Sequence, residues 1–418
     1  MLRRHITGRL LQALSDTPVV LLHGARQTGK STLVQRLART KRTRGRYLTL
    51  DDAGVLAAAS SDPVGFLAGL DCPVILDEVQ RAPGLFPAIK VIVDRAREPG
   101  SFLLTGSANV LLVPRISESL AGRMEVTKLM PFSQGEIDRR NEGFIEAVFA
   151  DDVSSANVPA ETRDELVARI LRGGYPEVVA REDARRRSAW FGSYLNTILQ
   201  RDVRDMAQIE GLTMLPRLLT LLSARASGLL NIADIARLAD IPNTTLRRYL
   251  ALLEMTFLIH LIPAWSANLR TRVVKSPKLT ITDSGLMAHL QGLTRERVHE
   301  RPDTLGPLLE NFVATEILKQ TTWSDRRVSV FHFRSHIGHE VDLVLEDPSG
   351  DVVGVEVKSA GSVNPSDFKG LRFLKEALGA RFRRGVVLYT GRESIPFGEQ
   401  LVALPVSALW RLNAKRVR

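Results

Sequence analysis

A glycine-containing segment between two apolar stretches constrains this chain more than any other feature. Residues 24–31 read Gly-Ala-Arg-Gln-Thr-Gly-Lys-Ser and fit the pattern G-x-x-x-x-G-K-[ST]. Residues 18–23, which precede it, are largely apolar and rich in β-branched side chains, as in a buried parallel strand. Residues 32–37, which follow it, repeat apolar side chains at helical spacing. Strand, loop and helix in this order predict a phosphate-binding loop in an α/β fold with a parallel sheet.

The residue types in this loop each have a role against a bound phosphate. The glycines let backbone N–H groups curl around the phosphate, Lys30 would reach the β- and γ-phosphates, and the Ser31 hydroxyl would ligate Mg²⁺. The alternative is a glycine turn that arises by chance, and the two flanks disfavour it. We therefore predict ATP and Mg²⁺ as cofactors, bound by Gly24, Ala25, Arg26, Gln27, Thr28, Gly29, Lys30, Ser31 and Thr32.

A second apolar run, residues 73–78, ends in two carboxylates, Asp77 and Glu78. A buried parallel strand would deliver these acids to the carboxyl edge of the sheet, beside the phosphate loop. Asp77 would hold Mg²⁺ through water, and Glu78 would polarise the water that attacks the γ-phosphate. Paired acids are also common at strand ends without such a role. Together with the loop, however, they predict hydrolysis as well as binding.

Two further segments contain candidate catalytic residues. Residues 101–109 predict a third strand whose polar end offers Ser107 or Asn109 to orient the attacking water, and a plain strand-to-loop turn fits equally well. Residues 119–126 place Arg123 before another predicted strand. Arg123 could neutralise charge in the transition state, within its own chain or from a neighbouring copy in a homo-oligomer. The alternative is that this arginine is a surface ion-pair partner.

With 418 residues the chain is too long for a single core, and we expect two to three domains. It has no run of eighteen apolar residues, so we expect no membrane-spanning segment. A single cysteine, Cys72, excludes an internal disulfide and suits a reducing compartment, which predicts a cytoplasmic protein. The net charge of +11 and the pI near 10.1 favour phosphate backbones and other anionic partners.

The middle of the chain predicts a helical module. Predicted helices at residues 215–224, 231–239 and 244–253 precede a predicted strand at residues 257–262. This order is typical of a winged helix-turn-helix, whose recognition helix contacts DNA. The residues that we predict to contact DNA, at the start of the third helix, are Thr244, Thr245, Arg247 and Arg248.

The charge of this module favours the same partner. From Arg217 to Lys275 the sequence contains eight basic and three acidic residues, which supply nearly half of the net positive charge. The alternative is that the module is a lid or a protein-binding surface, because such modules serve both purposes in ATPases.

The last third of the chain predicts a second α/β region. A helix is expected at residues 305–320, and two alternating segments at residues 340–346 and 352–358 predict a hairpin around a Pro-Ser-Gly turn. Alternation places acidic and basic side chains on one face of these strands, with the helix glutamate approaching them. This set could bind Mg²⁺ and activate a water against a phosphodiester, and comprises Glu310, Asp342, Glu356 and Lys358. The alternative is an edge hairpin with a solvated polar face.

These motifs resemble a family of proteins. Residues 24–31, 73–78 and 105–107 are similar to the AAA+-type ATPases of bacteria and archaea that carry a C-terminal DUF4143 region. Motifs similar to that C-terminal region lie at residues 173–176, 201–203, 310–311, 340–342 and 356–359. The resemblance covers nearly the whole chain. One departure concerns the third strand, where many AAA+ proteins have an asparagine and this chain has Ser107, with Asn109 two residues further on.

The resemblance implies an architecture and a function. It implies an AAA-like core at residues 1–140, a linker and helical region at 141–210, and a winged helix-turn-helix at 211–275. Residues 276–418 would form a domain similar to PD-(D/E)xK nucleases. We therefore predict an Mg²⁺-dependent ATPase that couples ATP turnover to DNA binding through its C-terminal half. The alternatives are an ATP-dependent nuclease and an ATP-driven signalling switch with a protein partner.

Overall fold

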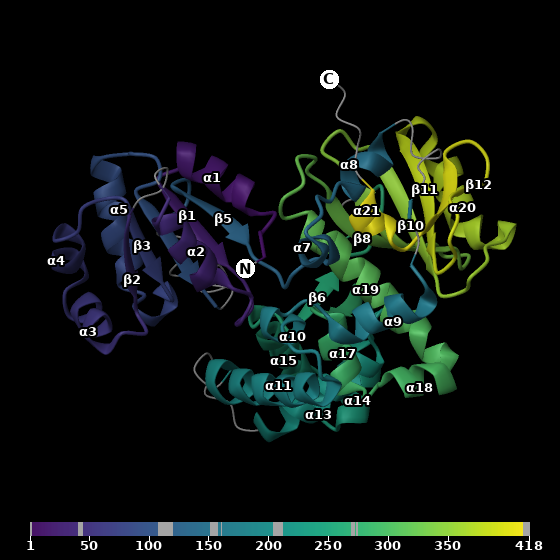
Figure 1. Cartoon of the computed structure of the whole chain (residues 1–418), viewed down its shortest axis with the longest axis horizontal. Helices are drawn as coiled ribbons and strands as arrows, with labels where there is room; N and C mark the ends of the chain where they lie inside the picture. The colour runs from purple at the N-terminus through teal and green to yellow at the C-terminus, as the bar shows by residue number, and fades with distance from the viewer. Residues whose placement is uncertain are drawn as a thin grey trace. The chain divides into compact units, whose positions relative to one another are not determined.

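Figure 1 shows the fold of the chain as a computed structural model. The structure describes residues 2–40, 45–107, 120–150, 158–159, 161–203, 212–268, 272 and 275–412. The chain folds into two compact units. The N-terminal unit comprises Arg4–Pro131 with Met255–Leu258, and the C-terminal unit comprises Met1–Arg3, Phe132–Glu254 and Ile259–Arg418.

The N-terminal unit is built on a five-stranded parallel sheet. Its strands are β1 (Val19–His23), β2 (Arg46–Thr49), β3 (Val74–Asp77), β4 (Phe102–Gly106) and β5 (Met124–Lys128), in the order β2-β3-β4-β1-β5. The predicted parallel sheet and its four predicted strands, now β1, β3, β4 and β5, are confirmed. Because β4 lies between β1 and β3, the carboxyl ends of these three strands are neighbours at one edge of the sheet.

Helices cover both faces of this sheet. They are α1 (Thr7–Asp16), α2 (Lys30–Ala38), α3 (Ala53–Ser61), α4 (Pro63–Ala68) and α5 (Leu85–Arg95), with a 3₁₀ turn at Val79–Arg81. Strand β1 shows why its sequence is an unbroken apolar run. Val19 and Leu21 pack in the core cluster that includes α5, whereas Val20 and Leu22 pack in the cluster that includes α1 and α2.

The C-terminal unit contains a six-stranded mixed sheet. Its strands are β8 (Ser329–Arg334), β9 (Glu340–Glu346), β10 (Val352–Lys358), β11 (Phe382–Tyr389), β12 (Ile395–Pro396) and β13 (Leu401–Pro405), in the order β12-β13-β11-β10-β9-β8. The predicted hairpin is confirmed, because β9 and β10 pair antiparallel. Strand β10 also pairs parallel with β11, and helix α20 (Lys369–Leu378) packs its apolar side chains into the core of this sheet.

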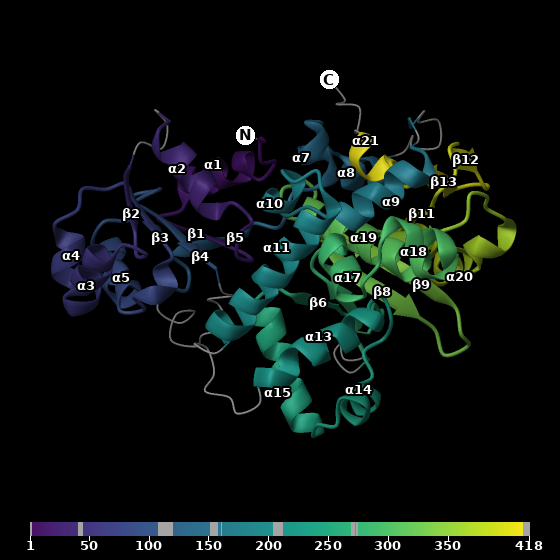
Figure 2. The same ribbon diagram turned by 60° about the horizontal axis from the view of Figure 1, so that its bottom comes forward.

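Helices and a two-stranded sheet form the rest of this unit. The longer helices are α9 (Arg163–Arg172), α11 (Ala184–Thr197), α13 (Leu215–Ala224), α14 (Ile232–Ala239), α15 (Asn243–Met255) and α19 (Leu305–Gln320). Shorter helices are α7 (Gln134–Asp138), α8 (Phe144–Phe149), α10 (Pro176–Val179), α17 (Ser284–Leu290), α18 (Arg295–Glu300) and α21 (Ala408–Arg411). Strands β6 (Ile259–Ile262) and β7 (Lys278–Ile281) pair antiparallel. Figure 2 shows α13, α14 and α15 in the teal part of the chain.

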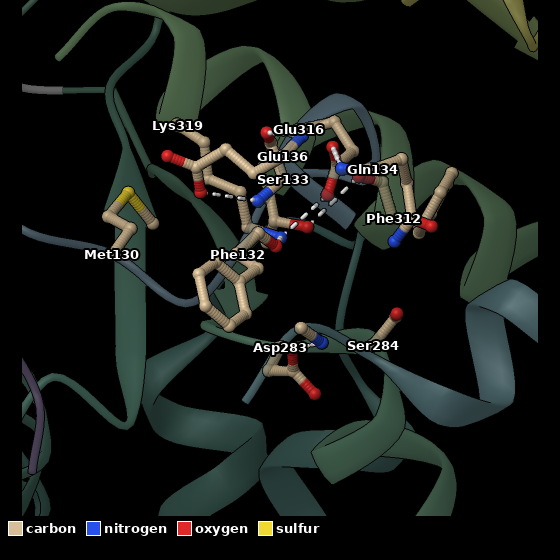
Figure 3. A network of polar contacts seen from close by, with 12 residues as sticks. Met130, Phe132, Ser133, Gln134, Glu136, Asp283, Ser284, Phe312, Glu316 and Lys319 are labelled. Carbon is tan, nitrogen blue, oxygen red and sulfur yellow. Dashed lines mark hydrogen bonds and ion pairs between the residues drawn. The ribbon is translucent and has the colours of Figure 1, made fainter. Parts of the chain in front are cut away.

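Most of helix α19 is buried, and its polar side chains bind other segments of the C-terminal unit. Figure 3 shows the network around Glu316 and Lys319. The Glu316 carboxylate accepts hydrogen bonds from the Gln134 N–H at 2.9 Å and from the Lys319 ammonium at 2.6 Å. Lys319 also donates to the Phe132 carbonyl at 3.0 Å. The segment after Pro131 is thereby fixed to α19. The boundary between the two units lies at Pro131/Phe132, and the boundary predicted from the sequence lies at residue 140.

The segment that follows Pro131 also contacts the glycine-rich motif at residues 173–176. The Gly174 N–H donates to the Asp283 carboxylate at 2.7 Å, and the Gly174 carbonyl accepts from the Phe132 N–H at 2.7 Å. A Cβ on Gly174 would lie 2.2 Å from the Phe132 carbonyl oxygen, so only glycine fits. Tyr175 is buried, and its hydroxyl is 2.9 Å from that of Tyr194. The motif therefore has a packing role in the C-terminal unit.

We expect Lys319→Met to destabilise the C-terminal unit by about 3–5 kcal/mol, because it leaves the buried Glu316 carboxylate without its cation. All four tryptophans lie after residue 131, so tryptophan fluorescence during denaturation with urea reports this unit alone. The matched control is Lys375→Met, which removes a lysine that is a third exposed. Equal unfolding midpoints for the two variants would contradict the role of the pair.

Candidate functional site

The predicted phosphate-binding loop has a backbone that requires its glycines. Gly24 has a φ of +151° and Gly29 a φ of +91°, both outside the range that side chains favour. A Cβ on Gly24 would lie 2.1 Å from the Leu129 carbonyl oxygen. Gln27 also adopts a positive φ, of +62°. The loop therefore follows β1 in a tight conformation that leads directly into α2.

Lys30 is the first residue of α2 and is almost fully buried. Its ammonium donates hydrogen bonds to the carbonyl oxygens of Gly24 and Ala25, both at 2.9 Å. The Thr28 hydroxyl donates to the same Ala25 carbonyl at 2.9 Å. These bonds close the loop around the Lys30 ammonium. Ser31 lies in the first turn of α2 and is half-buried, where the amino end of the helix favours anions.

The other loop residues differ in exposure. Ala25 and Thr28 are buried, Arg26 is half-buried, and Gln27 and Thr32 are exposed. The structure thus places all of the predicted nucleotide-binding residues in one continuous turn and the start of one helix.

Asp77 is the last residue of β3, at the same edge of the sheet as the loop. Its carboxylate accepts a hydrogen bond from the Tyr47 hydroxyl at 2.7 Å and another, at close range, from the Thr105 hydroxyl. Burial, the hydrogen bond to Asp77 and its negative charge raise the pKa of Tyr47 to about 12, so the hydroxyl remains a donor at neutral pH. Sequence reasoning missed Tyr47 and Thr105, which reach Asp77 only because β2 and β4 flank β3.

Glu78 follows β3 in a left-handed backbone conformation, with a φ of +59°. Its N–H donates to the Thr105 hydroxyl at 3.1 Å, and its carboxylate accepts from the Ser107 hydroxyl at 3.0 Å. The Gln80 amide donates to both Glu78 and Ser107, to the latter at 3.0 Å. The structure therefore brings Ser107, one of the two candidates for orienting the water, to Glu78. Asn109 lies outside the described residues.

Arg123 lies at the amino ends of the strands, whereas the phosphate loop follows the carboxyl end of β1. It precedes β5, and its carbonyl accepts from the N–H of Val19, the first residue of β1, whereas the loop follows the last residue, His23. The rise of these strands separates the two ends by roughly 13 Å. The Arg123 guanidinium instead pairs with Asp94 and lowers the pKa of that carboxyl. This placement disfavours a role within its own chain, and a role from a neighbouring copy stays a prediction.

A basic side chain that sequence reasoning missed, Lys128, ends β5 level with His23. Burial, with the nearby ammonium groups of Lys128 and Lys30, lowers the pKa of His23 to about 4, so the imidazole is neutral at neutral pH. The ring of Phe257 packs edge-on against His23 with centroids 5.3 Å apart, and the Lys128 ammonium lies 5.2 Å from the Phe257 centroid. The short segment Met255–Leu258 therefore belongs to the N-terminal unit, with the loop. The strand predicted at residues 257–262 begins only at Ile259.

The residues predicted to contact DNA lie along one side of α15. Thr244, Arg247 and Arg248 are exposed and Thr245 is half-buried, whereas Leu246 and Tyr249 are buried. The three predicted helices of this module are confirmed as α13, α14 and α15, and β6 and β7 form a hairpin after them. The basic side of α15 therefore faces away from its own core.

The predicted carboxylate cluster contains a lysine that sequence reasoning missed. The Lys278 ammonium, from β7, pairs with the Glu310 carboxylate and lies 3.1 Å from Asp342 Oδ1. The Val357 N–H donates to the other Asp342 oxygen at 2.9 Å. The two remaining predicted residues pair with each other, because the Lys358 ammonium lies 2.9 Å from Glu356 Oε1.

Lys278 gave no signal in the sequence, because it stands at the start of an ordinary apolar strand. Among the residues that the structure describes, no three acidic, histidine or cysteine side chains are grouped as the ligands of a metal ion would be.

Comparison with known proteins places the chain in a family. Residues 16–138 match an AAA domain, residues 163–297 a domain of unknown function (DUF8612), and residues 305–409 a domain of unknown function (DUF4143). Uncharacterized proteins of Mycobacterium bovis and Mycobacterium tuberculosis are each 32% identical over 409 residues, which is 97% of this chain and 84% of theirs. An uncharacterized protein of Haemophilus influenzae is 24% identical over 59% of this chain and 57% of its own length.

Solved structures with partial similarity include the Holliday junction branch migration motor RuvB of Thermotoga maritima. It is 18% identical, with 63% of this chain and 90% of that chain covered and a TM-score of 0.30. A signal transduction ATPase with a tetratricopeptide repeat sensor, from Pyrococcus horikoshii, is 14% identical, with 77% and 46% covered and a TM-score of 0.25.

The strand-loop-helix motif and the matching AAA domain define the class of this protein as an AAA-type P-loop protein. More closely, the chain belongs to the family in which an AAA domain is followed by a C-terminal DUF4143 region. In the described part of the chain, no helix has the length and apolar character needed to cross a lipid bilayer.

We expect Tyr47→Phe to raise the Mg²⁺ concentration needed for half-maximal binding of a fluorescent ATP analogue by about tenfold, because Asp77 loses a donor that orients it. Binding of the analogue without Mg²⁺ should not change. The matched control is Tyr389→Phe, which removes a hydroxyl of the C-terminal sheet that donates to a backbone carbonyl. An unchanged Mg²⁺ dependence in Tyr47→Phe would exclude this positioning role.

Proposed function

We propose that this protein binds ATP with Mg²⁺ at the phosphate loop and hydrolyses it. The observation that carries the proposal is the position of three groups at one end of the sheet: Lys30 follows β1, Asp77 ends β3, and Glu78 comes directly after it. A phosphate, its metal ion and an attacking water need these three kinds of group.

The residues of the loop fit a nucleotide phosphate. The backbone at Gly24 and Gly29 is held in positive φ, and Lys30 is anchored by carbonyl oxygens on the inner side of the loop. The Ser31 hydroxyl and the Asp77 carboxylate are hard oxygen ligands of the type that Mg²⁺ prefers. They would hold the ion, and Mg²⁺ would supply neutralisation of the charge on the β- and γ-phosphates.

Glu78 would accept the proton of the attacking water. Its carboxylate is oriented by Ser107 and Gln80, and its strained backbone conformation supports a functional role, because such strain is retained where a site requires it. Ser107 thus acts in this proposal as a positioning residue for Glu78.

We expect Glu78→Gln to bind ATP with near-normal affinity and to hydrolyse it at least about 100-fold more slowly, because it cannot accept a proton. Lys30→Ala should lose ATP binding. Both are measured by nucleotide binding beside phosphate release, with Lys90→Ala on α5 as the control for removal of a lysine from the same unit. Hydrolysis at the normal rate in Glu78→Gln would overturn the catalytic role, and full activity in Lys30→Ala would overturn the site.

We further propose that the C-terminal unit binds DNA, with α15 as the contacting helix of a winged helix-turn-helix. The exposed side of α15 supports this, because Thr244, Arg247 and Arg248 face outward from a helix whose other side is buried. ATP turnover would then change DNA affinity, or DNA would change the rate of turnover. A protein partner in a signalling switch is the other occupant of this surface.

We expect DNA affinity to fall as the salt concentration rises, and the double variant Arg247→Ala with Arg248→Ala to reduce the slope of log affinity against log salt by about 2. The measurement is fluorescence anisotropy of a labelled duplex. The matched control replaces Arg185 and Arg186, two exposed adjacent arginines on α11, by alanine and should leave the slope unchanged. Absence of salt-dependent binding would exclude DNA and favour the protein partner.

A further inference from the structure

The carboxylate cluster of the C-terminal unit, formed by Glu310, Asp342 and Glu356, already contains a cation. The Lys278 ammonium contacts both Glu310 and Asp342 and stands between the two carboxylates from helix α19 and strand β9. A divalent ion shared by these two residues would need the same position. The four residues predicted from the sequence as a metal-dependent nuclease site therefore do not fit a metal ion in this structure.

The fold itself places Lys278 there. Asn311, the neighbour of Glu310 on α19, accepts from the Ile281 N–H at 2.8 Å and donates to the Ile281 carbonyl at 3.0 Å. These two bonds fix β7 against α19. Lys278 begins the same short strand, and its backbone is held by pairing with Ile262 of β6. The ammonium is thus delivered to Glu310 by a buried strand and not by a mobile loop.

Each carboxylate of the cluster has an ammonium partner without a metal. Lys278 and Glu310 are both largely buried, so each needs the other as its charged partner. Lys358 pairs with Glu356, which leaves Lys278 as the cation shared by Glu310 and Asp342.

We propose that Lys278 is the permanent cation of this cluster and replaces the divalent metal that the carboxylates would otherwise bind. The C-terminal unit is then a metal-independent module, and the cluster holds β7, α19 and β9 together. The proposal does not depend on the ATPase assignment. It excludes DNA cleavage by Mg²⁺ bound between Glu310 and Asp342.

The cluster is open to solvent, so the proposal can be tested with a free ion. A cavity of about 160 Å³ is lined by Lys278, Glu310 and Asp342 together with His332 and Arg334. Mn²⁺ is the probe, because it takes the oxygen ligands that suit Mg²⁺ and free Mn²⁺ can be counted by electron paramagnetic resonance. The full-length chain is used without nucleotide, so that the phosphate loop contributes no tight site.

We expect the wild-type chain to show no Mn²⁺ site at this cluster tighter than about 1 mM. Lys278→Met should gain a site that binds at least about tenfold more tightly, because two carboxylates lose their cation. Adding Asp342→Asn to Lys278→Met should abolish the gain. Lys358→Met is the matched control, since it removes the other lysine and leaves Lys278 between the carboxylates.

Two results would overturn the proposal. One is a submillimolar Mn²⁺ site in the wild-type chain that Asp342→Asn removes. The other is a folded Lys278→Met variant, judged by circular dichroism, with no gain in Mn²⁺ binding. If Lys278→Met does not fold, the neutral variant Lys278→Gln replaces it. If neither variant folds, Mn²⁺ binding to the wild-type chain and to Asp342→Asn still tests the proposal.

Discussion

The C-terminal unit depends on one helix, α19, whose buried polar side chains bind segments from distant parts of the chain. Asn311 holds β7, Glu316 and Lys319 hold the chain just after Pro131, and Gln320 donates to the Leu409 carbonyl at 2.5 Å. Buried charges are stable only when they are paired. The helix therefore specifies which segments meet as well as burying apolar surface, and the position of Lys278 follows from it.

The N-terminal unit depends on a different constraint, the parallel order of its strands. The sequence was sufficient to predict the loop at residues 24–31 and the acids Asp77 and Glu78, because each motif consists of a few consecutive residues. It could not show that Tyr47 and Thr105 hold Asp77, since those contacts arise from the order of β2, β3 and β4 in the sheet. Arg123 precedes β5, so in a parallel sheet it lies at the amino ends of the strands and away from the loop.

In the C-terminal unit, too, the sequence predicts the elements but not the contacts between distant segments. The β9–β10 hairpin was predictable, because its strands alternate and its turn is explicit in the sequence, and helix α19 was predictable as a long apolar segment. Lys278 was not predictable, because the residues that surround it come from distant parts of the chain. A pattern of carboxylates along two strands and a helix suggested a metal site, and one buried ammonium from a third strand gives that pattern a structural explanation.

The central claim is that the phosphate loop forms one ATP site with Asp77 and Glu78. The most direct measurement is an experimental structure of the chain with Mg²⁺ and a non-hydrolysable ATP analogue. The account predicts the β- and γ-phosphates against the loop N–H groups and Lys30, with the metal ion beside Ser31 and Asp77 and with Glu78 facing the γ-phosphate. A nucleotide bound elsewhere, or phosphates in the loop with Asp77 and Glu78 turned away from them, would contradict it.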